Sequence, residues 1–177
     1  MEVPEILTRR LRLRGWREGD VELMAAIYAE PEVVRYLRQL DLEGTRQQLS
    51  RFVDHWAEHG FGLWAVEERA SGRLIGRIGL VHHDDWAETP HDAEVGWALQ
   101  RATWGRGLAT EGGAAALRFG FKTKGMERII SIAHSENVAS QRVMEKLGLQ
   151  REGATDWRDQ PVTWYAISRS DWRRLRS

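Results

Sequence analysis

The chain has 177 residues, enough for one domain whose core needs no disulfide or metal ion to hold it together. Its 26 Lys and Arg residues balance its 26 Asp and Glu residues, which argues against the basic surface of a nucleic-acid-binding protein. It has no Cys, and this excludes disulfides, thiolate zinc sites and a cysteine nucleophile.

The first 60 residues predict one strand and two helices. Residues 10–14 alternate strictly between Arg and Leu, the pattern of a half-buried strand. Asp20 is typical of a helix N-cap, and the helix that it starts should end near Pro31. A second helix is expected after Gly44, with apolar side chains spaced to form one buried face, and Gly60 should end it.

A hairpin and a further strand are predicted next. Two apolar runs, residues 61–67 and 74–81, flank the turn sequence Ala-Ser-Gly at 70–72. Residues 94–99 give another strand pattern. The long polar segment 82–92 lies before it, and we expect a loop there that is either mobile or borders a site.

Helical and strand patterns alternate through the last third of the chain. Helices are predicted at 108–124 and 138–147, and strands at 128–133, 149–155 and 162–168. Antiparallel hairpins therefore come first and helical crossovers later. This order predicts a mixed α/β sheet with helices on both faces.

The strongest chemical signal lies between a predicted strand and a predicted helix. Residues 103–113 read Thr-Trp-Gly-Arg-Gly-Leu-Ala-Thr-Glu-Gly-Gly. Gly105 and Gly107 allow a sharp turn, so that successive N–H groups and the positive end of a helix can face an anion such as a phosphate. Neither the P-loop pattern nor the dinucleotide fingerprint is present, and a plain glycine turn is the alternative interpretation.

Two more motifs accompany this segment. Residues 137–149 read Asn-Val-Ala-Ser-Gln-Arg-Val-Met-Glu-Lys-Leu-Gly-Leu, and residues 94–99 read Glu-Val-Gly-Trp-Ala-Leu. With these motifs the chain resembles the GNAT-type acyl-CoA N-acyltransferases, and most closely their RimJ/RimL branch of ribosomal-protein N-terminal acetyltransferases. Residues 8–14 and 165–172 also match that branch, so the resemblance covers nearly the whole chain.

The resemblance implies a fold and an activity. The fold is a single GNAT-type domain over residues 1–177, with a mixed, mostly antiparallel, splayed sheet of six to seven strands and helices on both faces. The activity is transfer of an acetyl group from acetyl-CoA to a primary amine by direct attack. Acetyl-CoA, or coenzyme A, is implied as a substrate, and no metal ion is implied.

The resemblance also implies which residues bind the cofactor. The pantetheine arm should lie along the strand at 95–99, and the pyrophosphate should meet the main-chain amides of residues 105–110. Trp104 stands where the family usually has Gln or Arg. Asn137 should contact the pantetheine or order nearby water, although a plain helix N-cap is compatible with the same residue. The cofactor-binding residues are Trp97, Ala98, Leu99, Trp104, Gly105, Arg106, Gly107, Leu108, Ala109, Thr110, Asn137 and Ser140.

The group that protonates the departing thiolate is in doubt. Many relatives carry a Tyr seven residues after the motif Asn, whereas this chain has Met144, which cannot donate a proton. Ser140 lies about one helical turn after Asn137 and is the predicted hydrogen-bond donor to the sulfur. Tyr165 is a second candidate, with core packing as its alternative role.

Glu94 is the predicted general base. An alkyl amine is mostly protonated at pH 7, so a carboxylate must remove a proton before the amine can attack. Glu94 begins the strand that lines the cleft and matches a carboxylate common in the branch. The alternatives are a structural carboxylate at a strand start, and Asp92 as the base.

Two groups of charged residues receive weaker interpretations. Residues 82–85, His-His-Asp-Asp, suggest a metal cluster, but neighbouring residues of a strand point to opposite faces, and a polar loop is favoured. Arg142 and Lys146 either reach the adenine or 3′-phosphate of the cofactor or are solvated helix charges.

The acceptor is left open between a protein N-terminus and a small amine. Acceptor selection is expected from residues 20–60, the 82–92 loop and the last hairpin. The aromatic rings in or near these regions either wall an acceptor cleft or belong to the core. They are Trp56, Trp64, Trp86, Trp157 and Trp164.

Two other functions are kept as alternatives. One is a non-catalytic module that binds or senses coenzyme A, which Met144 permits. The other is an N-acyltransferase for a longer acyl group such as succinyl. We expect a cytoplasmic protein without nucleic-acid or membrane partners, since no apolar run approaches about 18 residues and the first residues lack the bases of a signal peptide. A homodimer is possible by analogy with the branch.

Overall fold

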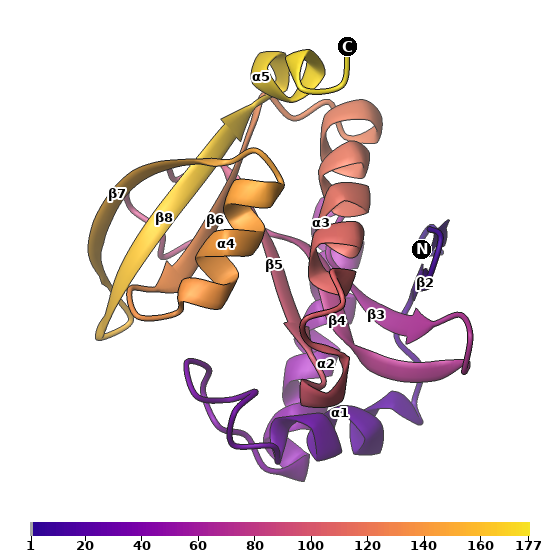
Figure 1. Ribbon diagram of the computed structural model, residues 1–177. Helices are drawn as coiled ribbons and strands as arrows, with labels where there is room; N and C mark the ends of the chain where they lie inside the picture. Colours follow the sequence, from indigo (N-terminus) through magenta and orange to yellow (C-terminus); the bar gives the residue numbers. More distant parts are fainter. Residues whose placement is uncertain (1) are drawn as a thin grey trace.

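A computed structural model describes residues 2–177, and Figure 1 shows its elements. In chain order they are β1 (Ile6–Leu7), β2 (Leu11–Arg14), α1 (Asp20–Tyr28), α2 (Leu42–His59), β3 (Leu63–Glu68), β4 (Arg73–Val81), β5 (Ala93–Leu99), α3 (Leu108–Arg118), β6 (Arg128–His134), α4 (Val138–Lys146), β7 (Gln150–Trp157), β8 (Gln160–Ser168) and α5 (Arg169–Arg174). Within residues 2–177, no helix is long and apolar enough to cross a membrane.

The strands form one sheet of eight, in the order β1-β2-β3-β4-β5-β6-β8-β7. Every neighbouring pair is antiparallel except β5 with β6, which is parallel. The predicted mixed, mostly antiparallel sheet is thus confirmed. The sheet has one strand more than the predicted upper number of seven, because the two residues of β1 are too few to show a periodicity.

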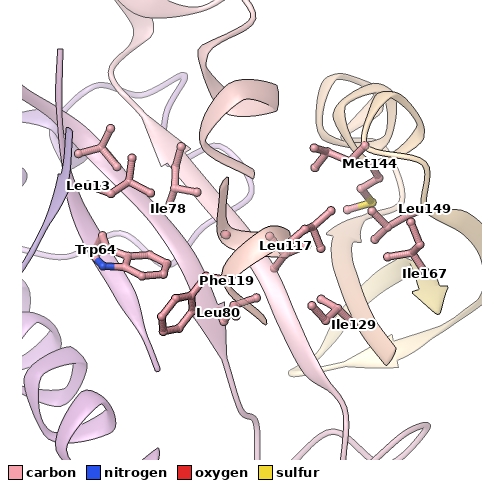
Figure 2. Packing of buried hydrophobic residues seen from close by; sticks show 14 of the residues in the cluster. Leu13, Trp64, Ile78, Leu80, Leu117, Phe119, Ile129, Met144, Leu149 and Ile167 are labelled. Carbon is pink, nitrogen blue, oxygen red and sulfur yellow. The ribbon is translucent and has the colours of Figure 1, made fainter. Parts of the chain in front are cut away.

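Adjacent side chains of β3 show that helices cover both faces of the sheet. Trp64 packs in a cluster with Leu117 of α3 and Met144 of α4. Its neighbour Ala65 packs in a separate cluster with Met24 of α1 and Leu49 of α2. Since successive side chains of a strand point to opposite faces, α3 and α4 cover one face, and α1 and most of α2 cover the other. Near the C-terminal end of α2, Trp56 reaches the first cluster and packs against Trp64. Figure 2 shows the first cluster, which joins the two halves of the sheet.

Strands β5 and β6 separate soon after they meet. They pair only at Ala93 with Ile129 and at Glu94 with Ile130, whereas β5 pairs with β4 over six residue pairs. Beyond Glu94 the two ribbons diverge toward their C-terminal ends (Figure 1). Residues 95–99 of β5 are therefore an inner strand edge that is not paired with β6, as the predicted splay requires.

The predicted N-cap of the first helix is wrong. Gly19 is the N-cap of α1, and Asp20 is the first helical residue. The Asp20 carboxylate instead accepts a hydrogen bond from Arg14 at 2.7 Å and one from the main-chain N–H of Arg17 at 2.8 Å. Arg14 is buried and also donates to Glu67 at 2.5 Å. This buried cation therefore determines where the Asp20 carboxylate lies.

Two helix boundaries differ from the predicted ones, and one helix is additional. The second helix begins at Leu42, before Gly44, because Asp41 caps it by accepting from the Gly44 N–H at 2.7 Å. The helix predicted over 108–124 is α-helical only to Arg118 and continues as a π-helical turn over Phe119–Thr123. The short helix α5 was not predicted.

Candidate functional site

The glycine loop, residues 104–110, leads from the end of β5 into the start of α3. Gly105 and Gly107 have φ values of 73° and 75°, in the left-handed region that strains an L side chain. Gly107 is the N-cap of α3, and no side chain caps this helix start. The N–H of Glu111 bonds to the Gly107 carbonyl at 3.0 Å, and the N–H groups of residues 108–110 have no intrahelical acceptor. The loop therefore fits an anion such as a pyrophosphate.

Residues of the turn between β1 and β2 hold this loop in place. The Glu111 carboxylate accepts from the Thr8 hydroxyl at 2.6 Å and from the main-chain N–H and Nε of Arg10 at 2.7 Å each. Burial opposes ionisation of Glu111, yet these hydrogen bonds outweigh it and lower its pKa below the usual range. Arg10 also donates to the Arg106 carbonyl oxygen at 2.8 Å. The sequence motif contained Glu111, but nothing in the sequence indicated its partners.

The side chain of Arg106 is engaged away from the loop. Its guanidinium pairs with the Glu68 carboxylate at 2.5 Å and holds the pKa of that carboxyl below its usual range. What Arg106 offers an anion is therefore its main-chain N–H. This agrees with a phosphate site built from backbone donors, which needs no lysine.

Along the inner edge of β5, main-chain groups that already have hydrogen-bond partners alternate with groups that face the opening. The Val95 carbonyl accepts from the Ser131 hydroxyl of β6 at 2.8 Å, and the Leu99 carbonyl accepts from the indole N–H of Trp104 at 2.8 Å. Because main-chain groups of every second residue face the same side of a strand, the N–H and C=O of Trp97 face the same opening. Trp97 thus lies between two carbonyls that already have partners.

Ala98, the remaining predicted cofactor residue of this strand, directs its main-chain N–H and C=O toward β4. It pairs with Arg77 of β4, and two residues further on Gln100 donates its N–H to the Ile75 carbonyl at 2.7 Å. The predicted cofactor residues of β5 therefore divide. Trp97 and Leu99 direct main-chain groups into the opening, whereas Ala98 is 7% exposed and directs its own toward the sheet.

Glu94 lies at the point where β5 and β6 separate, and both of its carboxylate oxygens have partners. Oε2 is 2.5 Å from Nε2 of His83, and Oε1 accepts from the Ile132 N–H of β6 at 3.3 Å. The side chains of Glu94 and His83 are each 14% exposed. Asp92, the alternative base, instead lies 3.6 Å from Arg128. The geometry therefore fits both a catalytic and a structural role for Glu94.

The helix α4 begins beside the same opening. The side-chain oxygen of Asn137 accepts from the Ser140 N–H at 3.1 Å, so Asn137 is an N-cap, as its alternative interpretation has it. The Asn137 amide nitrogen and the Ser140 hydroxyl are not used in this bond. Met144 is 1% exposed and belongs to the core.

Tyr165 of β8 packs under α4. Its hydroxyl is 3.4 Å from both Gln141 and Glu145, and burial, followed by the charge of Glu145, raises its pKa. A raised pKa makes Tyr165 a weaker proton donor, which favours the packing role. Arg142 and Lys146 on the same helix are exposed.

The five Trp residues considered for an acceptor cleft are mostly in the core. Trp56, Trp64 and Trp86 are 2%, 0% and 2% exposed, and Trp164 is 9% exposed. Trp157 is partly exposed, and its ring packs edge-on against His83 with the centroids 4.9 Å apart. Trp157 is therefore the one of these five that can meet an acceptor.

The segment between α1 and α2 approaches the opening from the other side. Tyr36 stacks on His134 at the end of β6, with ring centroids 4.9 Å apart, and its hydroxyl donates to the Glu136 carbonyl at 3.4 Å. This contact places the segment next to the start of α4. Among residues 2–177, no group of three or more His, Asp or Glu is arranged to hold a metal ion.

Comparison with known proteins defines the class. The acetyltransferase (GNAT) domain family matches residues 10–150, which is most of the chain, so this protein belongs to that family. It is 31% identical over 153 residues to the uncharacterized N-acetyltransferase YoaA of Bacillus subtilis, covering 85% of each chain. It is 30% identical over 177 residues to the uncharacterized N-acetyltransferase YnaD of the same organism, covering 94% of this chain and 98% of YnaD. The protein is thus an acyl-CoA-dependent acetyltransferase of the GNAT family.

Solved structures agree with the fold. A GNAT-family acetyltransferase from Bacillus anthracis superimposes with a TM-score of 0.80 at 26% identity, covering 94% of this chain and 99% of that one. An aminoglycoside acetyltransferase solved with coenzyme A has a TM-score of 0.79 at 21% identity, over 95% and 99% of the two chains. A ribosomal-protein-S5-alanine acetyltransferase from Vibrio fischeri has 0.76 at 17% identity, over 96% and 98%. The last two similarities show the fold alone.

Proposed function

We propose that this protein transfers an acetyl group from acetyl-CoA to a primary amine by direct attack of the amine. The observation that carries the proposal is the position of the glycine loop. It opens α3 at the end of β5, beside the strand edge that leaves β6 after Glu94. An anion-binding helix start and an unpaired strand edge thus adjoin each other, as a ligand with a pyrophosphate and a long amide-bearing arm requires.

The loop would bind the pyrophosphate through its backbone. The main-chain N–H groups of residues 105–110 and the dipole of α3 supply the positive potential. The left-handed conformation of Gly105 and Gly107 lets successive N–H groups turn toward one anion. Arg10 and Glu111 keep this conformation in place before the ligand arrives, which reduces the ordering cost of binding.

The inner edge of β5 would bind the pantetheine arm. The N–H and C=O of Trp97 are spaced to pair with an amide of the arm as a neighbouring strand would. Leu99 contributes its N–H, since its carbonyl already accepts from Trp104. Ala98 would contribute its side-chain face, and Asn137 its free amide nitrogen. The thioester end of the arm would then point toward Glu94.

Glu94 and Ser140 would perform the proton steps. The incoming amine is mostly protonated at pH 7. Glu94 removes a proton, directly or through one water molecule, and the amine nitrogen forms a bond with the acetyl carbon. The second proton of the attacking nitrogen passes to solvent as the carbon–sulfur bond breaks, and the Ser140 hydroxyl donates a hydrogen bond to the departing thiolate. No acyl-enzyme on sulfur is available, because the chain has no Cys.

For the acceptor we propose a protein N-terminus or a small amine, in a RimJ/RimL-like role. The chain has the same fold as a ribosomal-protein-S5-alanine acetyltransferase and as an aminoglycoside acetyltransferase, so the fold supports either class. A homodimer, as in that branch, is part of the same proposal. A longer acyl donor such as succinyl-CoA is the second candidate that the test includes.

The test is a mass-spectrometric screen of the purified protein. Acetyl-CoA and succinyl-CoA are each offered with peptides that have free N-termini, aminoglycosides and polyamines, and calorimetry measures binding of each acyl-CoA. The proposal predicts acetylated peptide or amine with acetyl-CoA. Binding of acetyl-CoA with no acylated product would favour the non-catalytic module, and product only from succinyl-CoA would favour the longer donor.

A further inference from the structure

We infer that His83, held by Arg158 at the tip of the last hairpin, is a positioning residue for the Glu94 carboxylate. This inference rests on the proposed function, because it takes Glu94 as the base. His83 lies in the loop after β4, and Arg158 lies in the turn between β7 and β8. The contact between them joins positions that are 75 residues apart in the chain.

The contacts form a continuous series from the hairpin tip to the carboxylate. Arg158 donates to the Asp85 carboxylate at 2.7 Å and 2.9 Å, and its Nη2 is 3.4 Å from Nδ1 of His83. Nε2 of His83 is 2.5 Å from Glu94 Oε2. The Trp157 ring packs against both residues: the Arg158 guanidinium lies 4.0 Å from its centroid, and the His83 ring lies edge-on to it. We call His83, Asp85, Trp157 and Arg158 the hairpin clamp.

The donors in this series fix the tautomer of His83. A guanidinium can only donate hydrogen bonds, so Nδ1 of His83 is the acceptor in its contact with Arg158. Nε2 of His83 then carries a proton and donates a hydrogen bond to Glu94. His83 therefore presents an N–H to the carboxylate because Arg158 occupies the other ring nitrogen. The arrangement matches that of a base whose orientation a third group sets.

The backbone of the hairpin turn supports a role for the Arg158 side chain. Trp157 pairs with Gln160, so Arg158 and Asp159 form a two-residue turn, and both have positive φ, 51° and 59°. Turns of this kind favour Asn and Gly, since the left-handed region strains other side chains. Here an Arg occupies the strained position, and its side chain reaches two residues of the 82–92 loop. Strain kept at such a position is a reason to look for a function.

Fixing His83 leaves the carboxylate oriented toward the opening. Oε2 is held by His83 and Oε1 by the Ile132 N–H, so the plane of the carboxylate is set from two sides. A carboxylate has about four lone-pair positions, and these contacts use two, which leaves acceptor capacity for the proton of an amine or a water molecule. A Cβ placed on Gly96 would be 3.8 Å from Oε1, so the carboxylate lies along β5 beside Gly96, whose missing side chain leaves room there.

The experiment compares two glycine substitutions in the same turn. Arg158→Gly removes the clamp and relieves the backbone, whereas Asp159→Gly relieves the neighbouring position and keeps Arg158. Asp159 is exposed, and both changes should leave the thermal unfolding temperature equal or higher. We expect kcat to fall about 10-fold to 100-fold in R158G only, with an unchanged KM for acetyl-CoA, as misplacement of a catalytic group by a fraction of an ångström predicts. Equal kcat in the two variants overturns the inference.

Variants of His83 separate positioning from packing. His83→Ala removes the donor, and His83→Gln restores an amide N–H of similar reach, so we expect kcat to fall in H83A and to recover in part in H83Q. Ring nitrogen signals of His83 in ¹⁵N NMR should show the proton on Nε2 in the wild type and lose this preference in R158G. Wild-type kcat in H83A, or a proton on Nδ1 in the wild type, overturns the inference.

Failure of the proposed function would be detected in other measurements than failure of this inference. It would be seen in the wild-type protein as no acylated amine, or in Glu94→Gln as undiminished turnover, before the clamp variants are compared. The His83 ring signals are readable without turnover, so they test the clamp in that case also.

Discussion

The two sides of the opening between β5 and β6 are built in different ways. On one side, the glycine loop offers main-chain N–H groups, and its shape comes from two left-handed glycines. On the other side, Glu94 is held by the Ile132 N–H of β6 and by His83 of the 82–92 loop, which Arg158 of the last hairpin contacts in turn. The first side depends on local backbone conformation, and the second depends on contacts between distant segments. Substitutions on the two sides should therefore affect different steps of the reaction.

The largest effect is expected from Glu94→Gln. The amide keeps the size of the side chain but cannot take a proton, so kcat should fall about 100-fold to 1,000-fold, within the range for loss of a general base. Calorimetry should give an unchanged Kd for acetyl-CoA, because Glu94 lies away from the glycine loop. Asp92→Asn is the control, because Asp92 is the alternative base and lies beside Arg128, and this variant should keep most of the turnover. Full turnover in E94Q would remove Glu94 from the chemistry.

The next effect should appear in cofactor binding. Gly107→Ala forces a side chain into the left-handed region at a cost of about 1–2 kcal/mol, so the Kd for acetyl-CoA should rise about 10-fold. The control is Gly19→Ala at the N-cap of α1. That glycine has φ of −69°, and nothing lies within 4 Å of an added Cβ. The same Kd in G107A as in G19A would contradict a phosphate site at this loop.

A smaller effect is expected from the support of the loop. Glu111→Gln weakens the hydrogen bonds from Thr8 and Arg10, and a loss of about 1 kcal/mol gives roughly 5-fold weaker binding of acetyl-CoA. Glu5→Gln is the matched control, since Glu5 pairs with Arg12 at an exposed position. Titration of both variants with acetyl-CoA checks this, and an equal Kd in both would mean that the pairs do not hold the loop.

The smallest effect concerns stability and pH. Burial lowers the pKa of His55, whose Nδ1 lies 2.9 Å from the Phe61 carbonyl and whose Nε2 accepts from the His82 N–H at 3.0 Å. Because the pKa is lower in the folded state, the unfolded chain binds the proton first as the pH falls below about 6.5. Stability from this group is complete above that pH and is lost as the pH falls toward the folded-state pKa.

Thermal unfolding between pH 8 and pH 5 measures this effect. The drop in Tm across that range should be smaller in His55→Gln than in the wild type, because the variant has no titrating ring at this position. His91→Gln is the control: His91 is exposed and is not among the groups that lower the pKa of His55, so this variant should lose as much stability as the wild type. An identical drop in H55Q and in the wild type would show that His55 does not contribute.

Much of the fold follows from local patterns in the sequence. The strand pattern at 128–133 and the helix pattern at 138–147 both match observed elements to within one residue at each end. Asp20 was misjudged because a buried Arg14 lies nearby in space and takes its carboxylate. The strand β1 was missed because two residues carry no period.

In the candidate site, too, the features formed by neighbouring residues were predictable, and those formed by distant residues were not. The glycine loop is a continuous stretch, so its residue types predict a sharp turn at a helix start, and the left-handed conformations of Gly105 and Gly107 confirm that turn. The partners of Glu94 could not be predicted, because His83 and Arg158 meet only when β4 and the last hairpin are placed in one sheet. The sequence His-His-Asp-Asp at 82–85 predicts a polar loop rather than a metal site, and in the fold His83 of this loop contacts Glu94 and Asp85 contacts Arg158.

One measurement decides between this division of roles and a site in which all residues act together. The Kd for acetyl-CoA and the single-turnover rate of acetyl transfer are determined on the same samples of wild type, G107A and E94Q. We predict that G107A binds acetyl-CoA more weakly and transfers at a near-normal rate when saturated, and that E94Q binds normally and transfers slowly. Weak binding in E94Q together with a slow saturated rate in G107A would contradict the account.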